Sequence, residues 1–136
     1  MMQVVVDTNI LVSSLWSKNG APAKVISMIL NGILTPCYDY RILAEYREVL
    51  LRPKFNFSES EVDALLGWFE SFGKSVLATP LSVKFQDDDD KKSYEVAKYC
   101  HAILITGNLK HFPKDKNVMS VIDFLYEFEK KNSKFK

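Results

Sequence analysis

The chain has few cysteines, almost no net charge and no long apolar run. Two cysteines, Cys37 and Cys100, occur among 136 residues, and neither has the spacing of a metal site. We therefore expect buried free thiols in a reducing compartment, with a disulfide between them as the alternative. The net charge is +1, so composition alone does not call for a nucleic-acid partner. Any site for a polyanion must come from local clusters of Lys and Arg.

Membrane and export signals are also missing from this sequence. No apolar run approaches the length that spans a bilayer, and no signal-peptide pattern precedes the first predicted strand. These absences predict a cytoplasmic protein without a membrane partner. The hydrophobic fraction of 47% and the charged fraction of 26% are typical of globular proteins, and the length fits one domain. We expect that domain over residues 1–129, followed by a basic tail over residues 130–136.

Short apolar runs alternate with stretches of helical apolar spacing. The runs predict strands at residues 3–6, 33–38, 75–78, 102–105 and 117–119. The spacing predicts helices at residues 23–30, 40–51, 58–72, 89–99 and 122–128. This alternation predicts an α/β fold, a three-layer sandwich in which helices flank a parallel sheet of about five strands. Pro36 predicts that its strand lies at an edge or ends early, because proline cannot donate to a ladder.

The first predicted strand ends on three polar side chains, Asp7, Thr8 and Asn9. The β-branched residues before them are typical of a strand that is buried on both faces. Open parallel sheets bind ligands beyond the carboxyl ends of their strands, so Asp7 is a candidate for a ligand site. The alternative is that Asp7 or Thr8 only caps the next helix, for which we expect one or two turns.

Acidic side chains occur at two later places. Glu45 lies beside the apolar stripe of its predicted helix, where a solvated helix surface is the alternative. Four aspartates, Asp87 to Asp90, open the helix at 89–99, although the helix dipole needs only one or two. Gathered in one cleft with Asp7, these groups would repel one another, and a divalent cation would relieve the repulsion. Oxygen ligands suit Mg²⁺ or Mn²⁺, and no Cys/His pair indicates zinc.

Four motifs occur along nearly the whole chain. They are Val6-Asp7-Thr8-Asn9, Ile42-Leu43-Ala44-Glu45-Tyr46, Asp90 seven residues before Ala97, and Ile105-Thr106-Gly107-Asn108-Leu109-Lys110-His111-Phe112. In this order and spacing they resemble the PIN domain family, small metal-dependent ribonucleases that include many toxins of toxin–antitoxin pairs. The ending Lys110-His111-Phe112 is similar to a subgroup of such toxins.

The resemblance implies roles for the matching residues. Asp7, Glu45 and Asp90 would bind one or two Mg²⁺ or Mn²⁺ ions, with Asp89 as a second candidate for the third position. Asn108 stands where many family members have a fourth Asp, which leaves open a single metal ion or a weak or altered activity. Thr106 would orient Asp7 or a metal-bound water.

The same resemblance indicates how RNA would be held. Thr8 and Asn9 would bond to Asp7 or to a phosphate, and cations would line the rim. These cations are Lys110, His111, Lys114, Arg47, Arg52 and Lys54. His111 has a second interpretation as a loop side chain bonded to the backbone. Trp16 is a candidate for an exposed lip on which bases stack, whereas Trp68 has the spacing of a core or interface residue.

The expected function is therefore a Mg²⁺- or Mn²⁺-dependent endoribonuclease, a homodimeric toxin held by a small antitoxin protein. Two alternatives are a catalytically weak or inactive PIN-like domain that binds RNA or protein, and an unrelated receiver-like or phosphatase domain. Receiver-like sheets usually carry paired acidic residues before the first buried Asp, where this chain has Met2 and Gln3.

Overall fold

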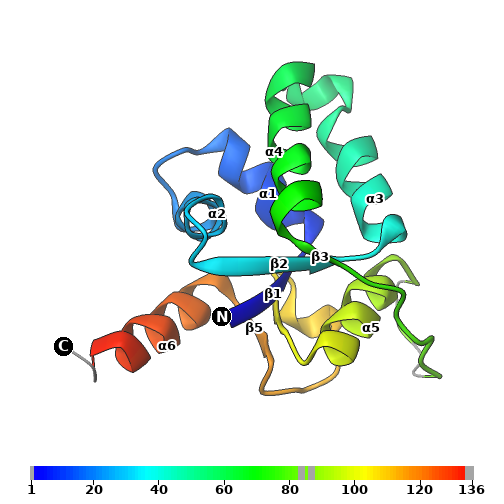
Figure 1. Cartoon of the computed structure of the whole chain (residues 1–136), viewed down its shortest axis with the longest axis vertical. Coiled ribbons are helices and arrows are strands. Elements are labelled where there is room, and N and C mark those ends of the chain that lie inside the picture. Colours follow the sequence, from blue (N-terminus) through cyan, green and yellow to red (C-terminus); the bar gives the residue numbers. More distant parts are fainter. Residues whose placement is uncertain (1, 83–84, 86–87, 134–136) are drawn as a thin grey trace.

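The computed structural model describes residues 2–82, 85 and 88–133. The described residues form one sheet of five parallel strands in the order β3-β2-β1-β4-β5. The strands are β1 (Met2–Val6), β2 (Leu34–Tyr38), β3 (Lys74–Ser75), β4 (Ile103–Ile105) and β5 (Val118–Met119). Helices cover both faces of this sheet (Figure 1), which confirms the predicted α/β sandwich.

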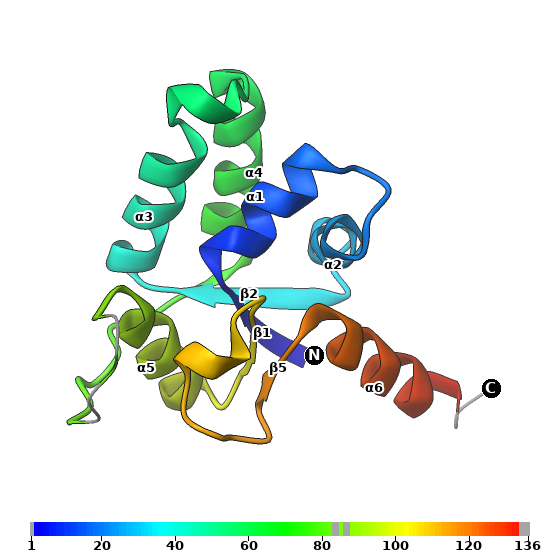
Figure 2. The ribbon, with the colours of Figure 1, turned by 180° about the vertical axis from the view of Figure 1, so that it is seen from behind.

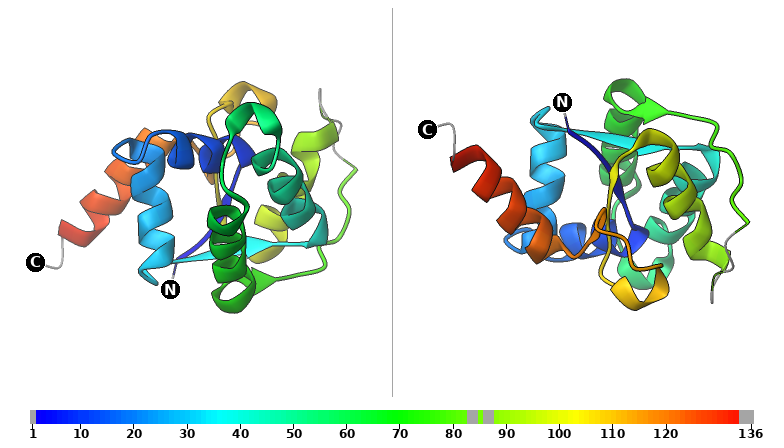
Figure 3. Two further views of the ribbon diagram at one scale, coloured as in Figure 1. Left: turned by 90° about the horizontal axis from the view of Figure 1, so that it is seen from above. Right: turned by 90° about the horizontal axis from the view of Figure 1, so that it is seen from below.

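The helices are divided unequally between the two faces. Those on one face are α1 (Thr8–Trp16), α2 (Ala21–Leu30), α3 (Tyr40–Leu50) and α4 (Glu59–Phe72). The other face carries α5 (Lys91–Cys100) and α6 (Val121–Ser133), as the views from above and below show (Figure 3). Short 3₁₀ helices lie in the connections: η1 (Pro53–Phe55), η2 (Asp88–Asp90) and η3 (Leu109–His111). Seen from behind (Figure 2), β1 enters the middle of the molecule and α1 follows it directly.

β1 is the central strand, and its composition follows from that position. Val4, Val5 and Val6 are at most 1% exposed because helices cover both of their faces. The strand pairs with β2 on one side and with β4 on the other, so that Val6 lies opposite Ile105. All strands run in the same direction, so residues after their carboxyl ends gather at one edge of the sheet. Asp7 and Asn108 therefore lie on the same side of the sheet, as predicted.

The prediction of an edge strand at Pro36 is wrong. β2 lies between β1 and β3, but β3 pairs only with Cys37 and Tyr38, which follow the proline. Pro36 is tolerated because no strand requires its missing N–H at that point. The third strand forms at Lys74–Ser75 instead of the predicted 75–78, and α1 is longer than the one or two turns expected.

The ends of α4 show how sequence sets helix boundaries. Ser58 caps the helix by accepting a 3.1 Å hydrogen bond from the Glu61 N–H. Gly73 ends it at a close approach, because a Cβ there would lie 2.5 Å from the carbonyl oxygen of Phe69 and 2.7 Å from that of Pro36.

Other predictions meet mixed outcomes. Cys37 and Cys100 are buried free thiols, so the disulfide alternative is wrong. α6 continues to Ser133, so the first part of the predicted tail is helical, while residues 134–136 lie outside the described residues. Across the described part of the chain, no helix combines the length and the apolar character needed to cross a bilayer.

Candidate active site

Asp7 lies where β1 passes into α1, and the fold fixes both of its carboxylate oxygens. Its backbone N–H continues the sheet ladder to the Ile105 carbonyl at 3.0 Å. Its Oδ1 accepts the Thr8 N–H at 2.9 Å, which caps α1, and its Oδ2 accepts the Thr106 hydroxyl at 2.7 Å. Burial raises the pKa of Asp7 above its ordinary value, opposed by these hydrogen bonds and reinforced by the charge of Glu45. Asp7 is thus a cap, as its alternative interpretation held, and also a buried acid.

Glu45 of α3 contacts the same corner through two partners. The Thr8 hydroxyl donates a short hydrogen bond to Glu45 Oε2, rather than to Asp7. The Lys92 ammonium lies 2.7 Å from Glu45 Oε1 and donates to the backbone oxygen of Asp89 at 2.7 Å. The Glu45 side chain is 24% exposed and that of Lys92 only 13%. The solvated helix surface proposed as an alternative for Glu45 does not describe this position.

The aspartate run contributes one well-shielded side chain. Asp90 is 15% exposed, and its Oδ2 lies 3.2 Å from Nδ1 of His111, which comes from η3. The Asp89 side chain is 83% exposed. Asp87 lies outside the described residues, and only the backbone of Asp88 is described. Burial therefore favours Asp90 over Asp89 as the third acidic group.

These groups line one cleft with a volume of about 490 Å³. Its lining residues are Asp7, Thr8, Asn9, Ala44, Glu45, Glu48, Val49, Arg52, Asp89 and Asp90. Arg52 is held there by Glu48, with Nη2 2.9 Å from Oε2. Thr106 lies behind Asp7, and the backbone N–H of Asn108 donates to its hydroxyl at 3.0 Å. Thr106, Asn108, Lys110 and His111 do not line the cleft. Thr106 and His111 nevertheless contact Asp7 and Asp90, which do.

The donor chemistry of the cleft suits a hard divalent cation, because carboxylate oxygens face it from three segments. Asp7, Glu45 and Asp90 are the residues that would hold such an ion. Among the described residues, however, no three His, Cys, Asp or Glu side chains are grouped closely enough to share one. Two of these acids have other partners: Lys92 binds Glu45, and His111 lies against Asp90. The residues fit the chemistry of a metal site, with an ammonium group now providing the positive charge.

Two residues that matter for this geometry were not singled out from the sequence. Lys92 looks like any exposed helix lysine until α3 and α5 are placed side by side. Tyr46 is fully buried, and its hydroxyl donates a 2.5 Å hydrogen bond to the Val6 carbonyl, next to Asp7. Burial raises the pKa of Tyr46 far above its ordinary value, which keeps its hydroxyl a donor. Only the three-dimensional fold reveals either contact.

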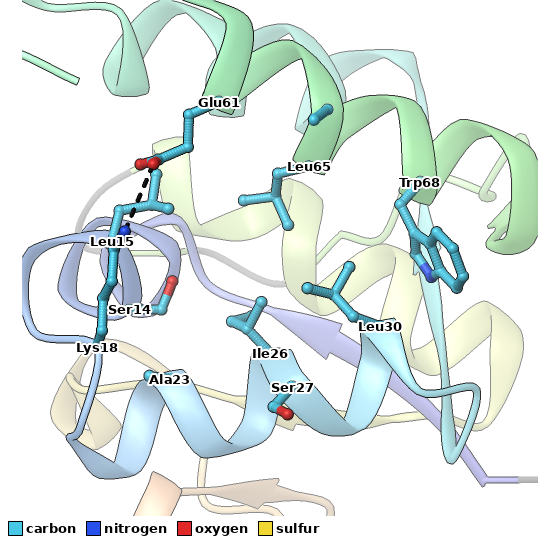
Figure 4. A pocket seen from close by; sticks show the side chains of 11 residues that line it. Ser14, Leu15, Lys18, Ala23, Ile26, Ser27, Leu30, Glu61, Leu65 and Trp68 are labelled. Carbon is cyan, nitrogen blue, oxygen red and sulfur yellow. Dashed lines mark ion pairs between the residues drawn. The ribbon is translucent and has the colours of Figure 1, made fainter. Parts of the chain in front are cut away.

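A second cavity of about 400 Å³, which shares no lining residue with the acidic cleft, lies among α1, α2 and α4 (Figure 4). Its walls are mainly apolar, and an ion pair of 3.6 Å between Lys18 and Glu61 crosses one end. Trp68 lines it, half-buried, and donates from its ring nitrogen to the Ile29 carbonyl at 3.2 Å. Trp68 therefore packs as the predicted core or interface residue.

Comparisons with known proteins agree with this arrangement. The family model described as "PIN domain" matches residues 3–110, which contain the first three motifs and the fourth as far as Lys110. The chain belongs to the PIN domain family. PIN domains are generally nucleases, and this supports the assignment of the chain to the hydrolases. The chain is also similar to an uncharacterized protein of Methanocaldococcus jannaschii, with 32% identity over 128 residues, covering 90% of this chain and 76% of that protein.

Proposed function

We propose that this protein is a Mg²⁺- or Mn²⁺-dependent endoribonuclease and the toxin of a toxin–antitoxin pair. The observation that carries the proposal is the buried Asp7 carboxylate at the end of the central strand. It opens into a cleft that Glu45 and Asp90 also line. Membership of the PIN family supports a nuclease with these acids as its metal ligands.

The chain's own residues would divide the work. A bound divalent ion lowers the pKa of a water and offsets charge on the phosphate oxygens. Thr106 and the Thr8 N–H fix the direction of the Asp7 oxygens, so that this group is oriented before any ligand arrives. Arg52, which lines the cleft, and Lys110 of η3 would supply positive charge for phosphates, and His111 of the same turn lies against Asp90.

A second candidate is a binding domain with weak or no catalysis. It is favoured by the ion pair between Lys92 and Glu45, which offers a carboxylate to an ammonium rather than to a metal. Asn108 in place of an acid favours it as well. The two candidates differ in one measurable respect, which is whether RNA is cut.

The test is cleavage of single-stranded RNA by the purified protein with Mg²⁺, with Mn²⁺ or with EDTA. We expect cleavage with either metal, none with EDTA, and none by Asp7→Asn. Asp123→Asn is the matched control, because it makes the same chemical change on the exposed face of α6. RNA binding without cleavage under all conditions would favour the second candidate.

The toxin assignment has its own test. Induced expression should arrest growth, Asp7→Asn should not, and a small neighbouring gene should rescue the arrest. An active nuclease that leaves growth untouched would contradict the toxin role alone. We also propose that the protein is cytoplasmic and forms a homodimer. Light scattering after gel filtration measures the mass and so tests the dimer.

A further inference from the structure

Three aromatic rings gather at the far end of α1. Trp16 makes edge-to-face contacts with Phe55 at 5.9 Å and with Phe57 at 6.0 Å between ring centroids. The two phenylalanines stack on each other at 5.5 Å with an angle of 11° between their planes. Although Trp16 has these neighbours, 64% of it is exposed. We call Trp16, Phe55 and Phe57 the aromatic platform.

The platform lies at the C-terminal end of α1, and the N-terminal end of the same helix borders the acidic cleft. At one end, Thr8 of α1 contacts Glu45 of α3, and at the other Trp16 of α1 contacts Phe55, just after α3. At 1.5 Å per residue, α1 separates Thr8 from Trp16 by roughly 12 Å. The cleft also follows α3 in this direction, since Glu45, Val49 and Arg52 all line it. A strand of a few nucleotides would span this distance.

Cationic side chains occur close to the aromatic platform. The Lys54 ammonium lies 5.1 Å above the Phe55 ring and, within the described part of the chain, forms no ion pair. Arg52 and Lys18 lie within three residues of Phe55 and Trp16 in the sequence and form exposed pairs with Glu48 and Glu61. Exposed ion pairs of this kind are weak, so a phosphate can take over either cation with little penalty. Aromatic faces interleaved with cations are typical of surfaces that bind single-stranded nucleic acid.

We propose that the aromatic platform is a base-stacking site for single-stranded RNA, and that it holds a few nucleotides to one side of the acidic cleft. The identity of the ligand as RNA rests on the proposed function. A purely apolar partner surface would not account for the cations around the rings, whereas a nucleotide uses both features. Stacking tolerates every base, so the platform would add affinity without selecting a sequence.

The test measures binding of a short labelled single-stranded RNA by fluorescence anisotropy, in EDTA. Trp16→Ala should weaken binding by about 5- to 100-fold, the range for loss of one stacked base, and Trp16→Phe should retain most of it. Tyr126→Ala is the matched control, because Tyr126 is 66% exposed, on α6, and should leave affinity unchanged. Lys54→Ala should reduce the slope of log K against log salt by about 0.7. A circular-dichroism melt of each variant checks its folding.

The second readout is tryptophan fluorescence with unlabelled RNA. Quenching that is present in the wild type and absent in Trp16→Phe would assign the contact to Trp16. Equal affinity of folded Trp16→Ala and wild type would overturn the platform, as would a Trp16 signal that responds to protein concentration and not to RNA. Trp16-dependent binding without cleavage would leave the platform standing and contradict the nuclease. Cleavage together with binding that does not depend on Trp16 would support the nuclease and contradict the platform.

Discussion

Replacing Lys92 by Met should destabilise the metal-free protein and strengthen its binding of metal. The Lys92 ammonium lies 2.7 Å from Glu45, with 13% and 24% of the two side chains exposed. At that distance the bare attraction is about 6 kcal/mol for an effective dielectric of 20, and desolvation offsets much of it. A partly buried pair falls between exposed pairs and fully buried ones, so we expect a loss of about 1–3 kcal/mol. For a chain of this length that lowers Tm by about 3–10 °C.

The same free energy should reappear in metal affinity. In the wild type, an ion at Glu45 must first displace the ammonium, and Lys92→Met removes that step. Mn²⁺ should therefore bind the variant about 5- to 100-fold more tightly than it binds the wild type. Millimolar Mn²⁺ should accordingly raise the Tm of the variant by more than it raises the Tm of the wild type. Electron paramagnetic resonance of free Mn²⁺ measures the affinity, and thermal melts across a Mn²⁺ titration measure the change in Tm.

Lys91→Met is the matched control, because Lys91 is the neighbouring lysine and no described contact pairs it with an acid. It should change neither quantity. The reasoning is refuted if Lys92→Met melts at the wild-type temperature, or if its affinity for Mn²⁺ is equal to or weaker than that of the wild type.

Two further predictions concern the framework around the site. Tyr46→Phe removes the buried hydrogen bond to the Val6 carbonyl, so the free energy of unfolding measured in urea should fall by about 1–2 kcal/mol. An unchanged free energy of unfolding would contradict a stabilising role for this hydrogen bond. The pKa of Asp115 is lowered, chiefly by the hydrogen bond from Lys98. Its contribution to stability is therefore present above its unfolded pKa of 3.8 and lost as pH falls through the lower folded value. Thermal melts from pH 7 to acid should show a steeper loss below about pH 4 for the wild type than for Asp115→Asn, and parallel curves would contradict the assignment.

The main part of the fold could be predicted because local patterns determine it. The β-branched run of Val4, Val5 and Val6 indicates a strand buried on both faces, and Ser58 starts α4 through a bond three residues away. The local sequence pattern does not predict the place of a strand in the sheet, because that place depends on which strands pair with it. Pro36 suggests an edge, yet β2 is internal because β3 is so short.

The site shows the same division. Strand ends and parallel topology placed Asp7 at this edge of the sheet, and the family resemblance implied that Thr106 orients it. The structure joins the two by a hydrogen bond. Thr8 bonds to Asp7 through its backbone N–H, whereas its hydroxyl donates to Glu45 of α3, a contact that the sequence does not reveal. Lys92 escaped notice because a lysine on an amphipathic helix has the same local pattern whether it meets water or a carboxylate. Contacts between residues far apart in the chain leave no such pattern.

The central claim is that Asp7 serves chemistry rather than stability, and a paired measurement on Asp7→Asn tests it most directly. RNA cleavage in Mn²⁺ should fall by more than about 100-fold, since losing even a residue that supports a ligand costs 10- to 100-fold. The midpoint of urea unfolding should stay the same or rise, because burial raises the pKa of Asp7 and so opposes its charged form. Cleavage by Asp7→Asn at the wild-type rate would contradict the account.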